Sequence, residues 1–461
     1  MTDDQYLNAF GRTIFFSAAV AFISMSMALV LAGFADRIIR GATTYRTLLI
    51  WPYAVAPVLA GALWLFMFNP TIGIFPYLLD FVDYNWNHYL NGGEAMFLVI
   101  MAAAWKQIAY NFLFYLAAMQ AIPRSITEAA DAGLQGVLGR VHRPRSGWVG
   151  GAIGDLDDPR HRHDRGPVPL CREKGAILMV EQRPLLAIAA HIILLLGVAM
   201  VAFPVWITFV GASHEAERML QSPIPMWPGD QFFVNFRQTM WGSGLEGTQT
   251  APVYMMLFNS LVMAMMIAIG KIAISLLSAF AIVYFKFPFR MGFFWMIFIT
   301  LMLPVEVRIL PTFEVVADLG MLNSYWGLTV PLIASATATF MFRQVFLTIP
   351  DEMLESARID GAGPVRFFWD ILIPLSRTNI AALFVILFIY GWNQYLWPLL
   401  ITTDTEMMTI VVSIKQMLEA AEQSPQWNII MMTALLAMLP PILVVIGMQK
   451  LFVKGLTETD K

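Results

Sequence analysis

Four ionisable side chains interrupt the long apolar stretches of this sequence: Lys106, Lys271, Glu306 and Arg308. A charge at membrane depth costs free energy, so such a side chain usually faces a cavity, a partner or a water-filled path. Arg308 is the strongest candidate ligand for an anion, because a planar guanidinium matches the geometry of a phosphate better than an ammonium does. The alternative is that Glu306 and Arg308 pair with each other or bind lipid headgroups.

Two further polar groups stand in apolar surroundings, Asn393 and Gln394. They could line a path through the protein or form hydrogen bonds to a neighbouring helix. Lys271 lies near the middle of its apolar stretch and cannot easily reach water, so we expect it to face other helices. A packing role opposite a backbone carbonyl is the expected alternative to substrate contact there. The candidates for a substrate path are therefore Arg308, Glu306, Asn393, Gln394 and Lys271.

The sequence contains no constellation that indicates catalysis. It lacks a G-x-x-x-x-G-K-[ST] loop, so any ATP hydrolysis would fall to a separate subunit. His161, His163 and Cys171 are the sharpest candidates for a metal site, but no helical or strand spacing places them on one element. We therefore expect no catalytic residue, no metal and no cofactor.

Composition indicates the surroundings in which these residues must lie. Apolar residues make up 58% of the chain and charged residues 13%, against about 45–50% and about 25% in soluble domains. The surface of a soluble fold could not accommodate this apolar excess. We therefore exclude a soluble enzyme and predict an all-α polytopic membrane protein in the lipid bilayer. The net charge of −3 gives no reason to expect a nucleic-acid partner.

The apolar stretches are long enough for helices that cross a bilayer, which need about 20 residues. Of the 29 Lys and Arg residues, 22 fall in one alternate set of connecting segments and 5 in the other. Because basic residues favour cytoplasmic loops, the N-terminus should lie outside and the C-terminus in the cytoplasm. Nine stretches qualify as spans: 13–35, 47–68, 95–120, 185–210, 256–285, 291–310, 325–347, 378–400 and 429–449.

Residues 134–178 differ in composition from the rest of the chain. They are rich in Arg, Gly, Pro, His and Asp and show no periodicity, so we expect a linker without regular structure. A second explanation is translation in a wrong reading frame, in which case Met179 would be a natural start. The chain thus divides into a three-span part at 1–133, this linker, and a six-span part at 179–461.

A short motif occurs on both sides of the linker. Ile122-Pro123 is followed by Glu128-Ala129-Ala130, and Ile349-Pro350 is followed at the same spacing by Glu355-Ser356-Ala357. Both copies follow an apolar stretch on the side predicted to be cytoplasmic. Such a repeat is typical of two homologous helical bundles related by an axis along the membrane normal.

The second copy predicts a helix, a turn and another helix. Thr348 has the spacing of a capping box and Pro350 suits a first helical turn, so a helix should run through Glu352 to Asp360. The run Gly361-Ala362-Gly363 should then break that helix.

A second short helix should begin at Pro364 and end at Pro374, which closes a loop over residues 348–374. This loop should present a surface of both polar and apolar side chains, which needs a protein partner. The alternative is an amphipathic helix that rests on lipid headgroups. The apolar side chains expected on that surface are Met353, Leu354, Ile359, Phe367 and Phe368.

The stretch Glu355-Ser356-Ala357-Arg358-Ile359-Asp360-Gly361-Ala362-Gly363-Pro364, which leads to Ile371-Leu372-Ile373-Pro374, resembles the EAA loop of bacterial maltose-type ABC importer permeases. In that family the loop is a coupling helix that docks on the ATPase subunit. The resemblance implies that Glu355 lies at this contact and that Gly361 supplies the turn, while Ser356 replaces the usual Ala. The residues that it assigns to coupling are Glu355, Ser356, Ala357, Asp360, Gly361, Ala362 and Pro374.

Other stretches resemble the two permeases of sn-glycerol-3-phosphate importers in this family. Residues 298–308 and 390–400 are similar to the second permease, and residues 49–57 and 105–114 to the first. The resemblance implies a complete second permease in the six-span part. It implies a truncated first permease, with a broken coupling loop, in the three-span part.

The same resemblance implies a location in the bacterial inner membrane and three protein partners. These are a homodimer of ABC ATPase subunits at the cytoplasmic face, the other permease subunit and a periplasmic substrate-binding protein. The substrate would be sn-glycerol-3-phosphate or a related glycerophosphodiester.

Three alternatives to this function remain open. The permease could carry a sugar or an oligosaccharide, because residue chemistry alone does not separate these substrates. An ion-coupled secondary transporter would need a carboxylate at membrane depth, for which Glu306 is the acidic candidate. The chain could also be a fusion whose N-terminal part has no function.

Overall fold

In the computed structural model, every regular element of the described part of the chain is a helix. This observation confirms the predicted all-α fold. The predicted linker at 134–178 and the first-half motif at 128–130 lie outside the described residues. The description covers residues 4–36, 41–122, 184–242, 251–300, 305–420 and 426–457, together with Ile126 and Leu303.

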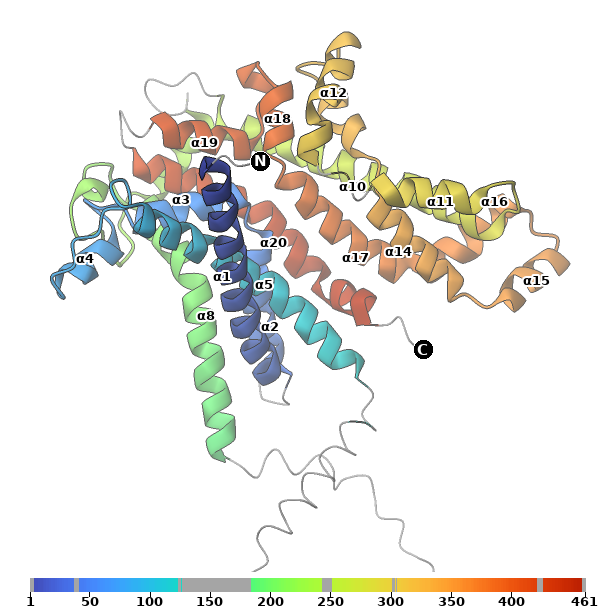
Figure 1. Ribbon diagram of the computed structural model, residues 1–461, viewed down its shortest axis with the longest axis horizontal. Coiled ribbons are helices and arrows are strands. Elements are labelled where there is room, and N and C mark those ends of the chain that lie inside the picture. The colour runs from blue at the N-terminus through green and yellow to red at the C-terminus, as the bar shows by residue number, and fades with distance from the viewer. Residues whose placement is uncertain are drawn as a thin grey trace, which may run out of the picture.

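The first helices form a small bundle, drawn from dark blue to cyan in Figure 1. Its two long helices, α1 and α5, pack along each other. A hydrogen bond from Asn111 Nδ2 to Ser24 Oγ, 3.1 Å long, joins them inside the bundle. The elements are α1 (Asp4–Ala35), α2 (Ala42–Ile50), the 3-10 helix η1 (Trp51–Ala54), α3 (Pro57–Met67), α4 (Ile74–Asp80) and α5 (Gly92–Ala121).

The remaining helices form a larger bundle in which α17 packs between α10 and α20. Small residues allow this close approach, as is common between helices in membranes. At Gly391 on α17, an added Cβ would lie 2.9 Å from the Cα of Ala264 on α10. The long helices of this bundle are α8 (Pro184–Ala212), α10 (Val253–Tyr284), α17 (Ile373–Trp392) and α20 (Trp427–Thr457).

Shorter helices complete this larger bundle. The α-helices are α9 (Phe232–Trp241), α11 (Arg290–Ile299), α12 (Val305–Asp318), α13 (Tyr325–Thr329), α14 (Ala336–Leu347), α15 (Asp351–Ile359), α16 (Pro364–Phe367), α18 (Leu396–Ile401) and α19 (Ile410–Ala420). The single turns are η2 (Arg218–Leu220), η4 (Val330–Leu332), η5 (Phe368–Leu372) and η6 (Thr405–Met407).

The two bundles lie against each other, with α8 and α20 at their boundary (Figure 1). Helix α8 contacts α1, α2 and α3, and α20 contacts η1 and α5. Buried side chains of both bundles belong to one apolar cluster.

Six of the described helices are long and apolar enough to cross a membrane. Two bent pairs raise the number to at most eight: α2 and η1 (Thr44–Ala54) with α3 at 98°, and α13 and η4 (Tyr325–Leu332) with α14 at 51°. These eight segments correspond to eight of the nine predicted spans. The number nine and the outside location of the N-terminus stay predictions.

The ninth stretch, 291–310, does not form one helix. Helix α11 ends at Ile299 and α12 begins at Val305. The ten residues of α11 extend about 15 Å, half of the hydrocarbon thickness of about 30 Å. Pro304 accounts for the interruption, because a proline disfavours helical backbone in the residue before it, and Leu303 lies in a bend.

Candidate functional site

Helices α15 and α16 are joined by a tight turn at Gly361. The φ of Gly361 is +74°, a left-handed conformation that residues with a Cβ adopt only with strain. Its amide donates to the carbonyl of Arg358 at 3.1 Å, and the amide of Ala362 donates to that of Ala357 at 2.9 Å. These two bonds form a Schellman motif, which satisfies carbonyls at the end of α15. Gly361, the left-handed residue after the C-cap Asp360, therefore ends the helix.

The start of α15 differs from the prediction. Pro350 is its N-cap rather than a first-turn residue, and no side chain caps the helix. The hydroxyl of Thr348 instead donates to the carbonyl of Val345, at 2.7 Å, at the end of α14. The predicted capping box is therefore wrong, because Thr348 bonds back to its own helix, as threonines often do.

Aromatic side chains attach the 348–374 loop to the bundle. The ring of Phe367 lies 5.2 Å from that of Tyr284, and the ring of Phe368 lies 5.0 Å from that of Phe280. Tyr284 also donates a hydrogen bond to the carbonyl of Phe346. Phe367 and Phe368 are thus buried, so their predicted place on the exposed surface is wrong. They belong to the core and hold the loop against the ends of α10 and α14.

Other residues of the loop stay on its surface. Ile359, Val365 and Trp369 are 86%, 70% and 62% exposed, and Met353 is also exposed, while Leu354 is half-buried. Of the residues that the resemblance assigns to coupling, Ala357 is buried and Ala362 is half-buried. The exposed ones are Glu355, Ser356, Asp360, Gly361 and Pro374. The loop therefore offers an acidic and apolar surface on a backbone fixed by the buried alanines and aromatic rings.

Pro374 does not end a helix. Helix α16 continues through η5, a π-helical turn, into α17, and Pro374 lies in the first turn of α17. In the π-helical turn the amide of Ile373 donates to the carbonyl of Phe368. This wider turn accommodates the proline ring, which lacks a donor and crowds the preceding turn of an α-helix.

A cationic cluster lies between α10, α12 and α17. Lys271 on α10 is 6% exposed, and its Nζ lies 3.7 Å from the centroid of the Tyr390 ring on α17. Arg308 on α12 is exposed and lies within electrostatic range of both Lys271 and Tyr390. Gln394 donates a hydrogen bond of 3.1 Å to the carbonyl of Tyr390. Three of the predicted path residues therefore lie near one tyrosine.

Neither cation of this cluster has an acidic partner among the described side chains. The two ion pairs found there lie elsewhere, one joining α16 to η5 and one on α19. Lys271 is removed from water, and the nearby positive charge of Arg308 adds repulsion. A bound anion would relieve both costs.

The remaining candidates have different surroundings. Asn393 is the C-cap of α17, and its Oδ1 is buried without a hydrogen-bond partner among the described residues. The side chain of Glu306 lies outside the described part, and so does its possible pairing with Arg308. Lys106 lies in the other bundle and donates to the carbonyl of Val55.

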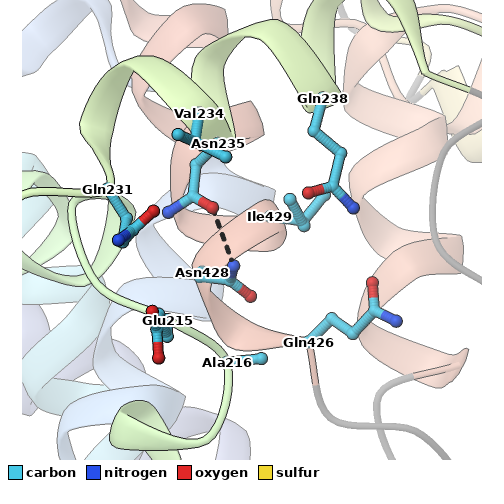
Figure 2. A pocket seen from close by; sticks show the side chains of 9 residues that line it. All are labelled: Glu215, Ala216, Gln231, Val234, Asn235, Gln238, Gln426, Asn428 and Ile429. Atoms are coloured by element: carbon cyan, nitrogen blue, oxygen red, sulfur yellow. Dashed lines mark hydrogen bonds between the residues drawn. The ribbon is translucent and has the colours of Figure 1, made fainter.

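A polar pocket of about 280 Å³ lies where the end of α8, helix α9 and the start of α20 meet (Figure 2). Buried Asn235 organises it: its Nδ2 donates to the carbonyls of Ala212 and His214, at 2.9 and 2.8 Å. Its Oδ1 accepts a hydrogen bond of 3.1 Å from Asn428. We call this cavity the amide pocket; its lining is Glu215, Ala216, Gln231, Val234, Asn235, Gln238, Gln426, Asn428 and Ile429.

Two acceptors of the amide pocket are unused by the described residues. Asn428 Oδ1 and Gln426 Oε1 are buried without a hydrogen-bond donor. The Asn235 contact fixes the Asn428 amide so that its oxygen points away from Asn235 (Figure 2). No Lys or Arg lines the pocket. Its chemistry therefore suits hydroxyl groups, which can donate to these oxygens, better than a phosphate.

Sequence reasoning missed the amide pocket because Asn235 and Asn428 are 193 positions apart. Asn and Gln are also ordinary residues at helix ends, so neither residue alone indicated a binding site. A weak signal was present in Gln231, Asn235 and Gln238, whose spacing of four and three residues places them on one side of a helix.

The family model for the inner membrane component of binding-protein-dependent transport systems matches residues 271–458. The sn-glycerol-3-phosphate transport system permease protein UgpE of Agrobacterium fabrum is 59% identical over 283 residues, which are 61% of this chain and 100% of that relative. The protein of that name from Brucella melitensis shows the same identity and coverage.

A solved bacterial ABC transporter involved in the import of the acidic polysaccharide alginate is 18% identical, with a TM-score of 0.49. The match covers 58% of this chain and 96% of that one. The family model and the full-length relatives agree with the apolar helices of the structure. The chain therefore belongs to the family of inner membrane components of binding-protein-dependent transport systems.

Proposed function

We propose that the chain is the permease subunit that carries sn-glycerol-3-phosphate, or a related glycerophosphodiester, in an ABC importer. As a member of its family it is a multi-pass transport protein of the inner membrane and not an enzyme. Support for the substrate comes from the relatives named above, which share 59% of the residues over their full length.

The single observation that carries the coupling role is the surface of the 348–374 loop. Its exposed Glu355 lies beside apolar Ile359 and a turn fixed by Gly361. We propose that an ATPase homodimer docks here at the cytoplasmic face, with Glu355, Ser356 and Asp360 at the contact. Ala357, Gly361, Ala362 and Pro374 then fix the backbone that transmits ATPase closure to α17.

The substrate path runs, in this proposal, past the cationic cluster. The phosphate of the substrate binds Arg308 and Lys271, whose charges lack an acidic partner among the described residues. Arg308 is exposed and so takes the phosphate first, and Lys271 beside Tyr390 lies deeper in the bundle. Gln394 and Asn393 then offer hydrogen bonds to the rest of the substrate, and Glu306 stays a candidate on the same helix as Arg308.

The amide pocket supplies a second recognition element. At a point of the path separate from the cationic cluster, it would hold hydroxyl groups of the substrate through Asn428 Oδ1 and Gln426 Oε1. A periplasmic binding protein delivers the substrate to the outer face, and closure of the ATPases then opens the path inward. This is alternating access, in which helical bundles rock about a site between them.

We further propose the division of the chain that its sequence indicates. Residues 179–461 are the six-span permease, residues 134–178 are a linker, and residues 1–133 are a three-span bundle derived from a first permease. The other permease subunit of the importer corresponds to this three-span part.

Uptake of labelled substrate tests the proposal. The chain is expressed with the ATPase and binding protein of the same bacterium, in cells that lack their own importer for sn-glycerol-3-phosphate. We expect uptake that unlabelled glycerophosphodiesters reduce and maltose does not. Competition by a sugar, or uptake of labelled maltose in place of sn-glycerol-3-phosphate, would contradict the proposed substrate.

A further inference from the structure

We propose that residues 4–121 are a permanent partner of the larger bundle, held on the surface formed by α8 and α20. The N-terminal part is then a working half of the molecule and not an inert remnant. Three independent sets of contacts at this surface support the proposal, and they involve residues 191–201 of α8 and the start of α20.

The first contact is a buried hydrogen bond. Nε1 of Trp105 on α5 donates to the carbonyl of Val201 on α8, at 3.1 Å, and Trp105 is 2% exposed. Pro204 lies within α8, and a proline disturbs the hydrogen bonds of the turn before it. In a membrane the carbonyls freed in this way need donors from neighbouring helices. Pro204 has no amide for the carbonyl of Met200, and Trp105 of the N-terminal bundle donates one residue further on, at Val201.

The second contact is close packing of α1 on α8. A Cβ added at Gly197 would lie 2.4 Å from Cδ2 of Leu31, which is buried. Lipid tails are as apolar as leucine, so helices associate in a bilayer through close packing at small residues. The fit of Leu31 against Gly197 is packing of that kind. Nearer the start of α8, Tyr45 on α2 and His191 form a side-chain hydrogen bond of 3.1 Å.

The third contact lies at the start of α20. The rings of Phe66 on α3 and Trp427 on α20 have centroids 4.9 Å apart. Both side chains are buried. Because α3 also contacts α19, this part of the larger bundle is covered by the N-terminal one.

The N-terminal bundle also has the internal order of a folded unit. Buried Glu94 accepts hydrogen bonds from the Asn87 amide, from Tyr84 and from Asn91, which organises the connection before α5. A carboxylate with three donors is well satisfied in a buried position. The surface that packs on α8 and α20 therefore belongs to an ordered bundle.

The face of α8 and α20 is already covered within the chain, so a separate permease chain cannot use that face. The chain supplies its own second half there. This association holds whatever substrate is carried, so its test needs no transport assay.

Cleavage of the assembled chain tests the inference. A protease site is inserted between residues 134 and 178, the tagged full-length protein is purified in mild detergent, and it is then cleaved. We expect the two halves to elute together in equal amounts. Elution of the tagged C-terminal half alone would overturn the proposal.

Two variants sharpen this test. Gly197→Leu should release the N-terminal half after cleavage, because a large side chain cannot fit against Leu31. Gly447→Leu on α20 is the control, since an added Cβ at Gly447 meets nothing within 4 Å, and its halves should stay together. Equal retention by both variants would contradict the proposed packing.

A cross-link covers the case in which Gly197→Leu fails to fold. In a Cys171→Ser background, Phe66→Cys and Trp427→Cys are joined with a short bifunctional maleimide before cleavage. We expect one band of full-length mass after cleavage. Two separate bands would overturn the proposal. In a cross-linked sample kept uncleaved, a band of twice the full-length mass would show that the halves pair between copies instead.

Discussion

At the scale of single residues, the proposed substrate recognition depends on a buried lysine and on two amides. Lys271 is expected to bind the substrate phosphate through its charge, since its described surroundings offer an aromatic ring but no carboxylate. Lys271→Met should therefore raise the KM for sn-glycerol-3-phosphate at least about tenfold, equivalent to about 1.4 kcal/mol. Lys271→Arg, which keeps the charge, should raise it much less.

Initial uptake rates over a range of substrate concentrations measure this effect. Lys106→Met serves as control, because Lys106 bonds to a carbonyl in the other bundle, and its KM should not change. An unchanged KM in Lys271→Met would show that the cationic cluster is not part of the substrate path.

A second residue-scale prediction concerns the amide pocket. Asn428→Leu removes the free acceptor that should hold a substrate hydroxyl, so the KM for sn-glycerol-3-phosphate should rise several-fold. Inhibition by inorganic phosphate, which has no polyol end, should stay the same. If affinity for sn-glycerol-3-phosphate and inhibition by inorganic phosphate both weaken, while the amount of protein in the membrane is normal, the variant has a general defect. That result would contradict hydroxyl recognition by Asn428.

At the scale of the elements, the turn between α15 and α16 makes the sharpest prediction. Gly361→Ala places a Cβ on a left-handed backbone at a cost of about 1–2 kcal/mol. Gly363→Ala is a matched control, because Gly363 has a negative φ and an added Cβ meets nothing within 4 Å at either position. ATP-dependent uptake should fall in Gly361→Ala and not in Gly363→Ala. Similar activity of the two variants would contradict a coupling role for this turn.

The elements also show what local sequence could predict. The end of α15 was predicted because a glycine there is a local signal for a left-handed cap. The burial of Phe367 and Phe368 was missed because it depends on Phe280 and Tyr284, far away in the chain. The division of 291–310 was missed because apolar composition outweighed Pro304. The cationic cluster was predicted in part. Its polar residues were identified because they interrupt apolar sequence, but Tyr390, the neighbour that they share, was not.

At the scale of the whole molecule, the chain combines two bundles with one orientation in the membrane. The distribution of Lys and Arg predicts that the N-terminus is outside and the 348–374 loop is cytoplasmic. In a Cys171→Ser background, Ile359→Cys should react with an impermeant maleimide only after the cells are opened. Leu7→Cys should react in intact cells. Reaction of both variants under the same condition would contradict this topology.

The central claim is that ATP hydrolysis by a separate subunit drives transport through the exposed surface around Glu355. The most direct measurement is uptake of sn-glycerol-3-phosphate into proteoliposomes that contain the full chain, its ATPase and its binding protein. We predict uptake only when ATP is available to the ATPase, loss of that uptake in Glu355→Ala, and full uptake in Asp80→Ala, which alters an exposed acid of the other bundle. Uptake driven by an ion gradient without ATP, or full activity of Glu355→Ala, would contradict the account.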